Sequence, residues 1–356
     1  MYNNYHHRGD RTGVGIYQQL NRHATTLMIG AVFLFLSGVV YTMMCGIGEN
    51  QPINYVDHAR AHDQSGRSLW KSALRGSESR SYAFLVAVVV TSPANFKQRM
   101  AIRKTWASTV VNRTHRGDAK VYFAIGTKAL APEAVAHLKK ENSVHDDLIL
   151  LSDVHDGYDK LTDKVLKTFV WLDSNVDYRY VLKTDDDSYV RLRPIFDELK
   201  RKRTQRLYWG FFYGNGRVKH TGQWAEKDWV LCDRYLPYAR GGGYVISADL
   251  VHYLAATAPY LKRYKSEDVS VGAWLAPLEI NRLHDPRFDT EYRSRGCHDD
   301  YLITHKKTIE QLNELHSNLV NKNKLCAKQF KLLNSYIYNW SVLPSQCCIR
   351  DNSSIP

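Results

Sequence analysis

Apolar residues divide the chain into a long apolar segment near the N-terminus, a polar connection, and a region in which short apolar runs alternate with amphipathic ones. The first short runs, mostly β-branched, predict strands covered on both faces. These predicted strands are 82–90, 120–126 and 148–151. Segments with helical spacing follow each strand, at 95–106, 132–140 and 161–172. This alternation predicts a doubly wound α/β fold in the first half of the region.

The second half of the region differs in composition. Residues 207–247 are rich in Tyr, Trp and Gly, and most of these rings are expected in the core, although exposed aromatics at loop tips favour sugars. Later elements are a strand at 180–182, helices at 248–256, 265–275 and 308–320, and a last strand at 301–305. Thr308 and Gln311 predict a capping box on the last helix.

The apolar segment 24–48 contains no charged residue and is long enough to cross a bilayer. Arg8, Arg11 and Arg22 precede it against a single Asp10, so the positive-inside tendency predicts a cytosolic tail at 1–23 and a luminal remainder. We therefore expect a single-pass signal anchor, with a polar stem at 49–81. A cleaved signal peptide is the alternative, but the segment is long and no clear small-x-small cleavage site follows it.

A luminal location agrees with the sequons and the cysteines. Acceptor sequons begin at Asn112, Asn339 and Asn352. The cysteines beyond the anchor, which should mostly pair in an oxidising compartment, are Cys232, Cys297, Cys326, Cys347 and Cys348. Because five is odd, one thiol is left free or intermolecular, and the pairing stays open. A zinc site is the alternative at the adjacent pair, but the chain has no Cys-x-x-Cys partner for it.

The formal net charge of +13 suits an anionic ligand such as a nucleotide, an acidic polymer or a membrane surface. No zinc-finger spacing and no long Lys/Arg run accompanies the charge, so we expect no nucleic-acid binding. The absence of a Gly-x-Gly-x-x-Gly fingerprint and of a Walker loop argues against a dinucleotide oxidoreductase and a P-loop kinase.

Three consecutive carboxylates, Asp185 to Asp187, follow the predicted strand 180–182 after Lys183 and Thr184. Ligands of α/β sheets gather beyond the carboxyl ends of the strands, and carboxylates suit Mg²⁺ or Mn²⁺, which commonly bridge to phosphate. A solvated acidic turn is the alternative. The helix expected at 95–106 carries arginines just after a strand, which suits a nucleotide pyrophosphate, although a surface helix would look similar.

Other candidate chemistry lies further along the chain. Gly241-Gly242-Gly243 could let the backbone approach a ligand or adopt positive φ. Glu267 and Asp268 open an apolar helix, where they could cap it and favour its dipole, or Asp268 could act as a general base. His305 ends the last strand, where it could be structural or a metal ligand.

Together these segments resemble the β1,3-glycosyltransferase family of the Golgi, from about Tyr82 to the C-terminus. The matching motifs, in order, are Arg99-x-x-x-Arg103-x-x-Trp106, Asp153 with Tyr158 and Leu161-Thr162-x-Lys164, Lys183 to Asp187, Gly241 to Tyr244, and Glu267-Asp268-Val269-x-Val271-Gly272. The resemblance implies a GT-A type catalytic domain at 82–356, a UDP-sugar donor, Mn²⁺ as cofactor, and transfer with inversion at the anomeric carbon.

Longer stretches are similar to one branch of that family, whose members add the second galactose of the tetrasaccharide that links glycosaminoglycans to proteoglycan cores. These stretches are 208–212, 231–238, 272–277 and 284–297. The resemblance implies UDP-galactose as donor, galactosyl-xylosyl core proteins as acceptor, residence in the Golgi membrane, and complexes with other transferases of linker synthesis. Alternatives are another β1,3-galactosyl- or N-acetylglucosaminyltransferase, or an inactive luminal chaperone or lectin.

The resemblance also implies roles for individual residues. The implied metal ligands are Asp185, Asp187 and His305, and the implied general base is Asp268, with an ordinary pKa near 4. The implied donor-binding residues are Arg99, Arg103, Asp153, Lys164, Asp186, Gly242 and Gly243. The implied acceptor-binding residues are Trp209 and Glu267.

Overall fold

The structure is a computed structural model that describes residues 80–111, 119–202, 205–351 and 356. The expected tail at 1–23, the expected anchor at 24–48, nearly all of the expected stem, and the sequons at Asn112 and Asn352 lie outside these residues. Within the described part of the chain, no helix combines the length and the apolar character needed to cross a membrane.

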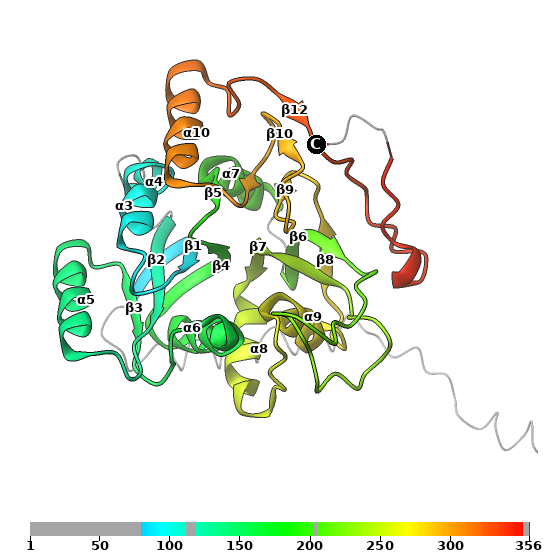
Figure 1. Ribbon diagram of the computed structural model, residues 1–356, viewed down its shortest axis with the longest axis horizontal. Coiled ribbons are helices and arrows are strands. Elements are labelled where there is room, and N and C mark those ends of the chain that lie inside the picture. The colour runs from blue at the N-terminus through cyan, green and yellow to red at the C-terminus, as the bar shows by residue number, and fades with distance from the viewer. Residues whose placement is uncertain (1–79, 112–118, 203–204, 352–355) are drawn as a thin grey trace, which may run out of the picture. The chain divides into compact units, whose positions relative to one another are not determined.

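A seven-stranded mixed sheet forms the centre of the described region (Figure 1). Its strands are β1 (Ser81–Val90), β2 (Ala119–Gly126), β3 (Leu148–Leu151), β4 (Val176–Asp185), β6 (Leu207–Tyr213), β7 (Tyr238–Ser247) and β8 (Asn281–His284). The spatial order is β3-β2-β1-β4-β7-β6-β8. The strands β3, β2, β1 and β4 are parallel, which confirms the predicted strand–helix alternation, whereas β7 runs antiparallel to both β4 and β6.

Helices cover both faces of this sheet. They are α3 (Phe96–Lys104), α4 (Ser108–Val111), α5 (Pro132–His145), α6 (Leu161–Asn175), α7 (Leu192–Lys202), α8 (Ala248–Thr257), α9 (Glu267–Leu275) and α10 (Ile309–Lys322). Core residues of α3, α7 and α10 belong to one hydrophobic cluster, and those of α6, α8 and α9 to another. β1 supplies both clusters, Leu85 and Val89 to the first and Val86 and Val88 to the second, because a strand alternates its side chains between two faces.

A smaller sheet lies beside the end of β4. It joins β5 (Tyr189–Val190), β11 (Ile303–Thr304) and β9 (Phe288–Asp289), with β11 in the middle. A further pair is β10 (Gly296–Cys297) with β12 (Phe330–Lys331), and three short 3-10 helices are η1 (Tyr158–Lys160), η2 (Ala258–Tyr260) and η3 (Pro344–Gln346). The smaller sheet brings the residue after β11, His305, next to the loop that follows β4.

The predicted boundaries differ from the observed ones mostly by length. β4 begins at Val176 rather than at residue 180, and the predicted strand 301–305 is reduced to two residues. The capping box of α10 is confirmed, since Gln311 N donates to Thr308 Oγ1 at 3.3 Å and Thr308 N donates to Gln311 Oε1 at 3.0 Å.

Among the five cysteines that the structure describes, four form disulfides and one is free, as their odd number requires. Cys297 and Cys326 form a disulfide that links β10 to the segment after α10, and the adjacent Cys347 and Cys348 form another. Cys232 is free and exposed. The prediction that these cysteines mostly pair and leave one free is therefore confirmed, with the free thiol on the loop between β6 and β7.

Candidate active site

The carboxyl end of β4 meets the end of β11 in a cluster of three ligand-type side chains. Asp185 ends β4, Asp187 follows two residues later, and His305 follows β11. His305 Nε2 lies 2.9 Å from Asp187 Oδ1 and 3.4 Å from Asp185 Oδ2. One ligand atom from each of the three residues falls within 4.8 Å of the others.

The chemistry of this cluster fits a divalent cation. Asp187 Oδ1 and His305 Nε2 face each other at 2.9 Å, and Asp185 Oδ2 lies 3.4 Å from the same nitrogen, so ligand-type atoms of all three residues converge on one point. Two carboxylates and an imidazole are together suited to a divalent metal ion.

His305 carries a proton when no metal is bound. Burial lowers the pKa of His305, but the carboxylates of Asp185 and Asp187 outweigh this effect and raise that pKa to about 9. A histidine must be neutral to ligate a metal, so metal binding to this cluster would release the proton of His305.

Lys183 connects this cluster to the start of α9. Its side chain is 1% exposed, and its Nζ donates to Asp185 Oδ1 at 2.8 Å, to Gly241 O at 2.7 Å and to Glu267 Oε2 at 3.0 Å. Glu267 is itself buried and accepts a second hydrogen bond from Tyr244 Oη at 2.5 Å. The expectation that Glu267 contacts an acceptor is therefore wrong in this structure, because its carboxylate is held by Lys183 and Tyr244.

Asp268 is the neighbouring carboxylate and is half-buried at the N-terminus of α9. Its Oδ2 accepts from Gly241 N at 3.0 Å and its Oδ1 from Val269 N at 2.9 Å, so both oxygens are fixed by the backbone. Burial raises the pKa of Asp268, although the charges of Arg240 and Lys183 lower it. The expected ordinary pKa is thus corrected upward, and the geometry gives a positioned, accessible proton acceptor.

The glycine run of β7 makes room for the protein's own side chains. A Cβ on Gly242 would lie 2.5 Å from His305 Nδ1, and a Cβ on Gly243 would lie 2.7 Å from Ile303 Cδ1. Neither glycine has positive φ. The protein groups that approach these glycines are His305 and β11, and the expected contact of the glycines with a donor stays a prediction.

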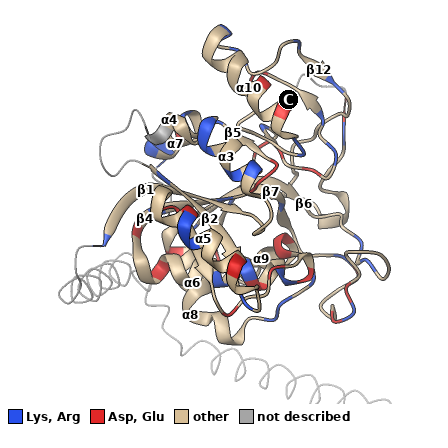
Figure 2. Ribbon diagram, turned by 60° about the vertical axis from the view of Figure 1, so that its left-hand side comes forward, with Lys and Arg blue, Asp and Glu red and all other residues tan. Residues whose placement is uncertain are grey.

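The two predicted donor-binding arginines of α3 form a buried ion-pair cluster instead. Arg99 is 1% exposed and donates to Glu141 Oε1 at 2.8 Å, to Glu141 Oε2 at 2.7 Å and to Ser92 O at 2.6 Å. Arg103 pairs with Glu141 and with Asp147, each at 2.7 Å. Figure 2 shows the Lys and Arg residues of α3 in blue. Both guanidinium groups pair with Glu141 of α5, and that of Arg103 also pairs with Asp147 just before β3, so the structure corrects the expectation of direct donor contact.

Replacing Glu141 by glutamine is expected to lower the free energy of unfolding by about 3 kcal/mol, because the substitution leaves Arg99 charged and incompletely paired in the core. Chemical denaturation measures this loss. The KM for the sugar donor should stay unchanged in the folded fraction, since neither arginine is placed to bind it. Glu133→Gln, an exposed position on the same helix, is the matched control and should leave both quantities unaltered. A raised donor KM in Glu141→Gln with unchanged stability would restore the donor-binding interpretation.

Two further predicted donor residues support the loop between β1 and α3. Asp186 Oδ2 accepts from Thr91 Oγ1 at 2.6 Å and from Asn95 Nδ2 at 2.8 Å. Lys164 is buried and donates to Thr91 O at 3.0 Å and to Asp156 Oδ2 at 2.6 Å. These contacts fix the loop next to the acid triplet, which gives Lys164 a supporting position rather than an exposed one.

Asp153 does not join them. Its side chain is 56% exposed and pairs with Lys167 at 2.6 Å on the surface. Asp156, three residues later, is the carboxylate that lies against Lys164, and it also accepts from Gly126 N at 3.1 Å. Asp153 thus pairs with Lys167 rather than with Lys164, and its contact with the donor stays a prediction.

Trp209 lies in the core. It is fully buried, its Nε1 donates to Asp285 Oδ2 at 3.0 Å, and its ring meets Phe288 edge to face at 5.1 Å. The expectation that it binds an acceptor is wrong, and the general expectation that most rings of this region are core is confirmed.

The residues that sequence reasoning passed over are mostly basic. Besides Lys183, they are Lys306, whose Nζ lies 3.1 Å from Asp187 Oδ2, and Arg240, whose guanidinium covers the Tyr213 ring at 4.1 Å. Lys183 had a usable signal, because residues i and i+2 of a strand share a face and Lys183 stands two before Asp185. Lys306 and Arg240 depend on the packing of distant segments.

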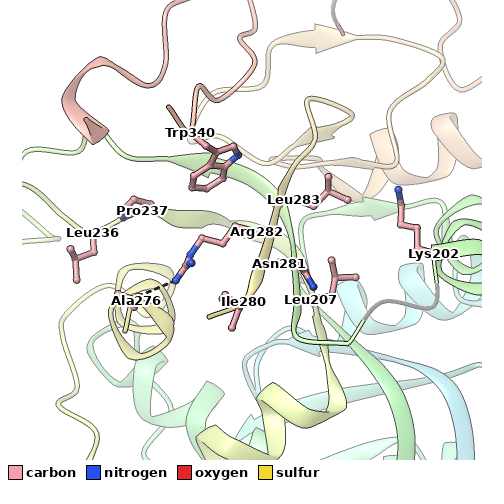
Figure 3. A pocket seen from close by; sticks show the side chains of 10 residues that line it. All are labelled: Lys202, Leu207, Leu236, Pro237, Ala276, Ile280, Asn281, Arg282, Leu283 and Trp340. Atoms are coloured by element: carbon pink, nitrogen blue, oxygen red, sulfur yellow. Dashed lines mark hydrogen bonds between the residues drawn. The ribbon is translucent and has the colours of Figure 1, made fainter. Parts of the chain in front are cut away.

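A pocket of about 830 Å³ lies elsewhere, along the edge strand β8. Figure 3 shows Trp340 above it and Arg282 beside it, with a hydrogen bond from Arg282 to the carbonyl of Ala276 at 3.2 Å. None of the metal-type ligands, nor Lys183 nor Asp268, lines this pocket. The candidate site is therefore the acidic cluster beside α9, where Figure 2 shows red segments, rather than this pocket.

Comparisons with known proteins give the family of the chain and several similar proteins. A family profile described as "Galactosyltransferase" matches residues 97–286. The chain is 43% identical over 338 residues to mouse "Beta-1,3-galactosyltransferase 6", covering 94% of this chain and 98% of that relative. It is 37% identical over 185 residues to human "UDP-GalNAc:beta-1,3-N-acetylgalactosaminyltransferase 2", covering 51% of this chain and 36% of that relative. Among solved structures, mouse xyloside xylosyltransferase 1 in its apo form aligns with a TM-score of 0.34 and 11% identity over 63% of this chain and 96% of that one.

Proposed function

The chain belongs to the galactosyltransferase family, and we propose that it is an inverting, metal-dependent β1,3-galactosyltransferase that uses UDP-galactose. The observation that carries the proposal is that the metal-type ligands and the candidate base lie near each other at the carboxyl end of β4. Asp185, Asp187 and His305 could hold the cation, and Asp268 lies on the same side, joined to Asp185 through Lys183 and Gly241. This mixed α/β arrangement is what a GT-A type nucleotide-sugar domain requires.

The reaction that we propose is a single displacement. Asp268 accepts the proton of the acceptor's 3-hydroxyl, whose oxygen forms a bond to the anomeric carbon of galactose as the bond from that carbon to UDP breaks on the opposite face. Lys183 keeps Asp185 and Glu267 in place, and the backbone amides of Gly241 and Val269 orient the carboxylate of Asp268. A bound Mn²⁺ would supply Lewis-acid neutralisation of the charge that grows on the departing UDP.

For the acceptor we propose galactosyl-β1,4-xylose on proteoglycan core proteins, which would place the enzyme in the synthesis of the glycosaminoglycan linker. Support comes from the branch-like stretches 208–212, 231–238, 272–277 and 284–297. The full-length match to a relative named a β1,3-galactosyltransferase supports the sugar and the linkage. We also propose that the chain is a single-pass Golgi membrane protein with a luminal catalytic domain, on the strength of the apolar segment 24–48 and its flanking charges. Complexes with other linker transferases belong to the same proposal.

A donor-by-acceptor assay on the full chain with Mn²⁺ tests this function. UDP-galactose, UDP-N-acetylglucosamine and UDP-N-acetylgalactosamine are each paired with galactosyl-β1,4-xyloside and with other β-galactosides, and the products are analysed for linkage. We expect galactose in β1,3 linkage on the galactosyl-xyloside, with rates at least about tenfold above those for the other pairs. Transfer of another sugar, or equal use of general galactosides, would reject the branch assignment. No transfer with any pair would favour the inactive chaperone.

A further inference from the structure

Three aromatic side chains outside the main hydrophobic clusters meet beside the candidate site. Tyr158 begins η1, while Trp224 and Tyr292 come from two loops, and we call the three residues the aromatic row. The centroids of Tyr158 and Trp224 are 6.5 Å apart and those of Trp224 and Tyr292 are 5.5 Å apart, both edge to face. Trp224 Nε1 donates to Tyr158 Oη. Tyr158 is 46% exposed and Tyr292 65%, while Trp224 is partly exposed, so these rings contribute little to the core.

The electrostatics of Tyr158 place one end of the row near both parts of the site. Burial raises the pKa of the Tyr158 hydroxyl, the Trp224 hydrogen bond lowers it, and the charges of Asp268 and Asp185 raise it further. Lys306 acts on the same hydroxyl in the opposite sense. The hydroxyl is therefore within electrostatic range of the candidate base and of the metal-type cluster.

The loop that carries Trp224 is fixed to the start of α9. Glu226, two residues after Trp224, is 7% exposed; its Oε2 accepts from Lys265 N at 2.6 Å and its Oε1 from Asp228 N at 3.1 Å. Lys265 stands two residues before Glu267 and three before Asp268. The buried carboxylate of Glu226 thus holds the ring of Trp224 on the side of the site that carries the candidate base.

The loop that carries Tyr292 is fixed to the other side of the site. Asp289 is fully buried and accepts from Ser294 Oγ at 2.5 Å and from Thr304 Oγ1 at 2.8 Å. Its carbonyl accepts from His305 N at 3.0 Å. Tyr292 is therefore held beside the strand that delivers His305, so the row runs between the side of Asp268 and the side of the metal-type ligands.

We propose that the aromatic row is the binding subsite for the acceptor, and that Trp224 stacks against the apolar face of an acceptor sugar. The inference rests on the proposed function and names the side chains that select its acceptor. A pyranose presents C–H groups on one face, and exposed aromatic rings bind such faces through apolar contact and through the ring quadrupole. The buried anchors at Glu226 and Asp289 hold the rings in advance, which reduces the entropy cost of binding. Trp224 lies on the loop that is held beside the candidate base, and the base must meet the acceptor hydroxyl, which assigns this ring to the acceptor.

Trp224→Ala in the full chain tests the proposal, with Tyr292→Ala as a second variant. We expect the KM for the acceptor to rise about fivefold to tenfold in Trp224→Ala, and less in Tyr292→Ala, as the loss of one stacking contact predicts. The KM for UDP-galactose should not change. Trp224→Phe should recover most of the acceptor affinity, because phenylalanine keeps a stacking face. Tyr260→Ala is the matched control, since Tyr260 is an aromatic side chain 89% exposed on η2.

The possible outcomes distinguish failure of the aromatic row from failure of the proposed function. An unchanged acceptor KM in both alanine variants would overturn the row, and so would a fall in thermal stability with donor and acceptor KM rising together. If the wild-type chain transfers a different sugar or uses a different acceptor, the proposed function fails, and the same variants measured with that acceptor decide on the row. Absence of transfer to every acceptor would reject both.

Discussion

Replacing Asp187 by alanine is expected to reduce sugar transfer by about a thousandfold or more, since several kcal/mol of charge stabilisation by the cation would be lost. The variant should remain folded, because Asp187 is partly exposed and its partners, His305 Nε2 at 2.9 Å and the substantially exposed Lys306, belong to the site rather than to the hydrophobic core. Initial rates of transfer at saturating donor and titration of Mn²⁺ binding by electron paramagnetic resonance measure the two effects. We expect Mn²⁺ affinity to fall together with the rate.

Asp197→Ala provides the control for this experiment. Asp197 lies on α7 and makes an exposed ion pair with Arg193 at 2.9 Å, an interaction that contributes little to stability. That variant should keep wild-type rates and Mn²⁺ affinity, and circular dichroism should show all three proteins melting within a few degrees of one another. Mn²⁺-dependent transfer that survives in Asp187→Ala would remove Asp187 from the metal site.

Asp268→Asn is expected to lower kcat by about a hundredfold to ten-thousandfold, the range that loss of a general base produces. An asparagine can still accept one of the two backbone hydrogen bonds, so the start of α9 should keep its conformation. Affinity for UDP, measured by calorimetry in the presence of Mn²⁺, should be unchanged within about twofold because Asp268 is not placed among the metal-type ligands. A nearly wild-type rate in Asp268→Asn would end the candidacy of this residue as the base.

The pH dependence of the wild-type chain tests the same residue independently. Burial raises the pKa of Asp268 above the ordinary value of 3.8. Since a base acts only when deprotonated, kcat/KM should fall as the pH decreases through the raised pKa, and the acid limb should therefore begin at a higher pH than for an exposed aspartate. Asp268→Asn should lack this limb. An acid limb centred at or below 3.8 would show that burial does not perturb the group.

Much of the fold could be predicted because it depends on local patterns. A run such as Leu85 to Val90 is apolar on both faces and has no other stable place than a covered strand. The acid triplet could be placed at the carboxyl end of a strand for the same reason, because it follows a buried strand. The capping box of α10 depends on two residues three apart, which the sequence displays fully.

The errors concern side chains whose role depends on a distant partner. Arg99 has the same sequence context whether it binds a phosphate or Glu141, and its partner lies 42 residues away. Trp209 lies in the apolar and aromatic run 208–212, a composition that predicts burial. The resemblance to a family suggested instead that Trp209 contacts a ligand.

The role of Lys183 was overlooked for a different reason. The strand period placed its side chain on the face of Asp185, and a lysine inside an apolar strand must find a countercharge. Only the position of Glu267, 84 residues later, could not be read from the pattern. The pairing of Cys297 with Cys326 was unpredictable in the same sense, since connectivity follows from the tertiary structure.

β7 lies antiparallel beside β4, and β11 returns to the carboxyl end of β4. This arrangement has a consequence for biosynthesis. The contacts that complete the site are non-local, with Lys183 to Glu267 separated by 84 residues and Asp187 to Lys306 by 119. Contacts of high contact order form late, after the loop-closure entropy of the intervening chain has been overcome. A nascent chain that has emerged only as far as α9 can contain the parallel strands and the acid triplet, but it lacks His305. Affinity for the cation should therefore arise only near the end of synthesis, once β11 has docked.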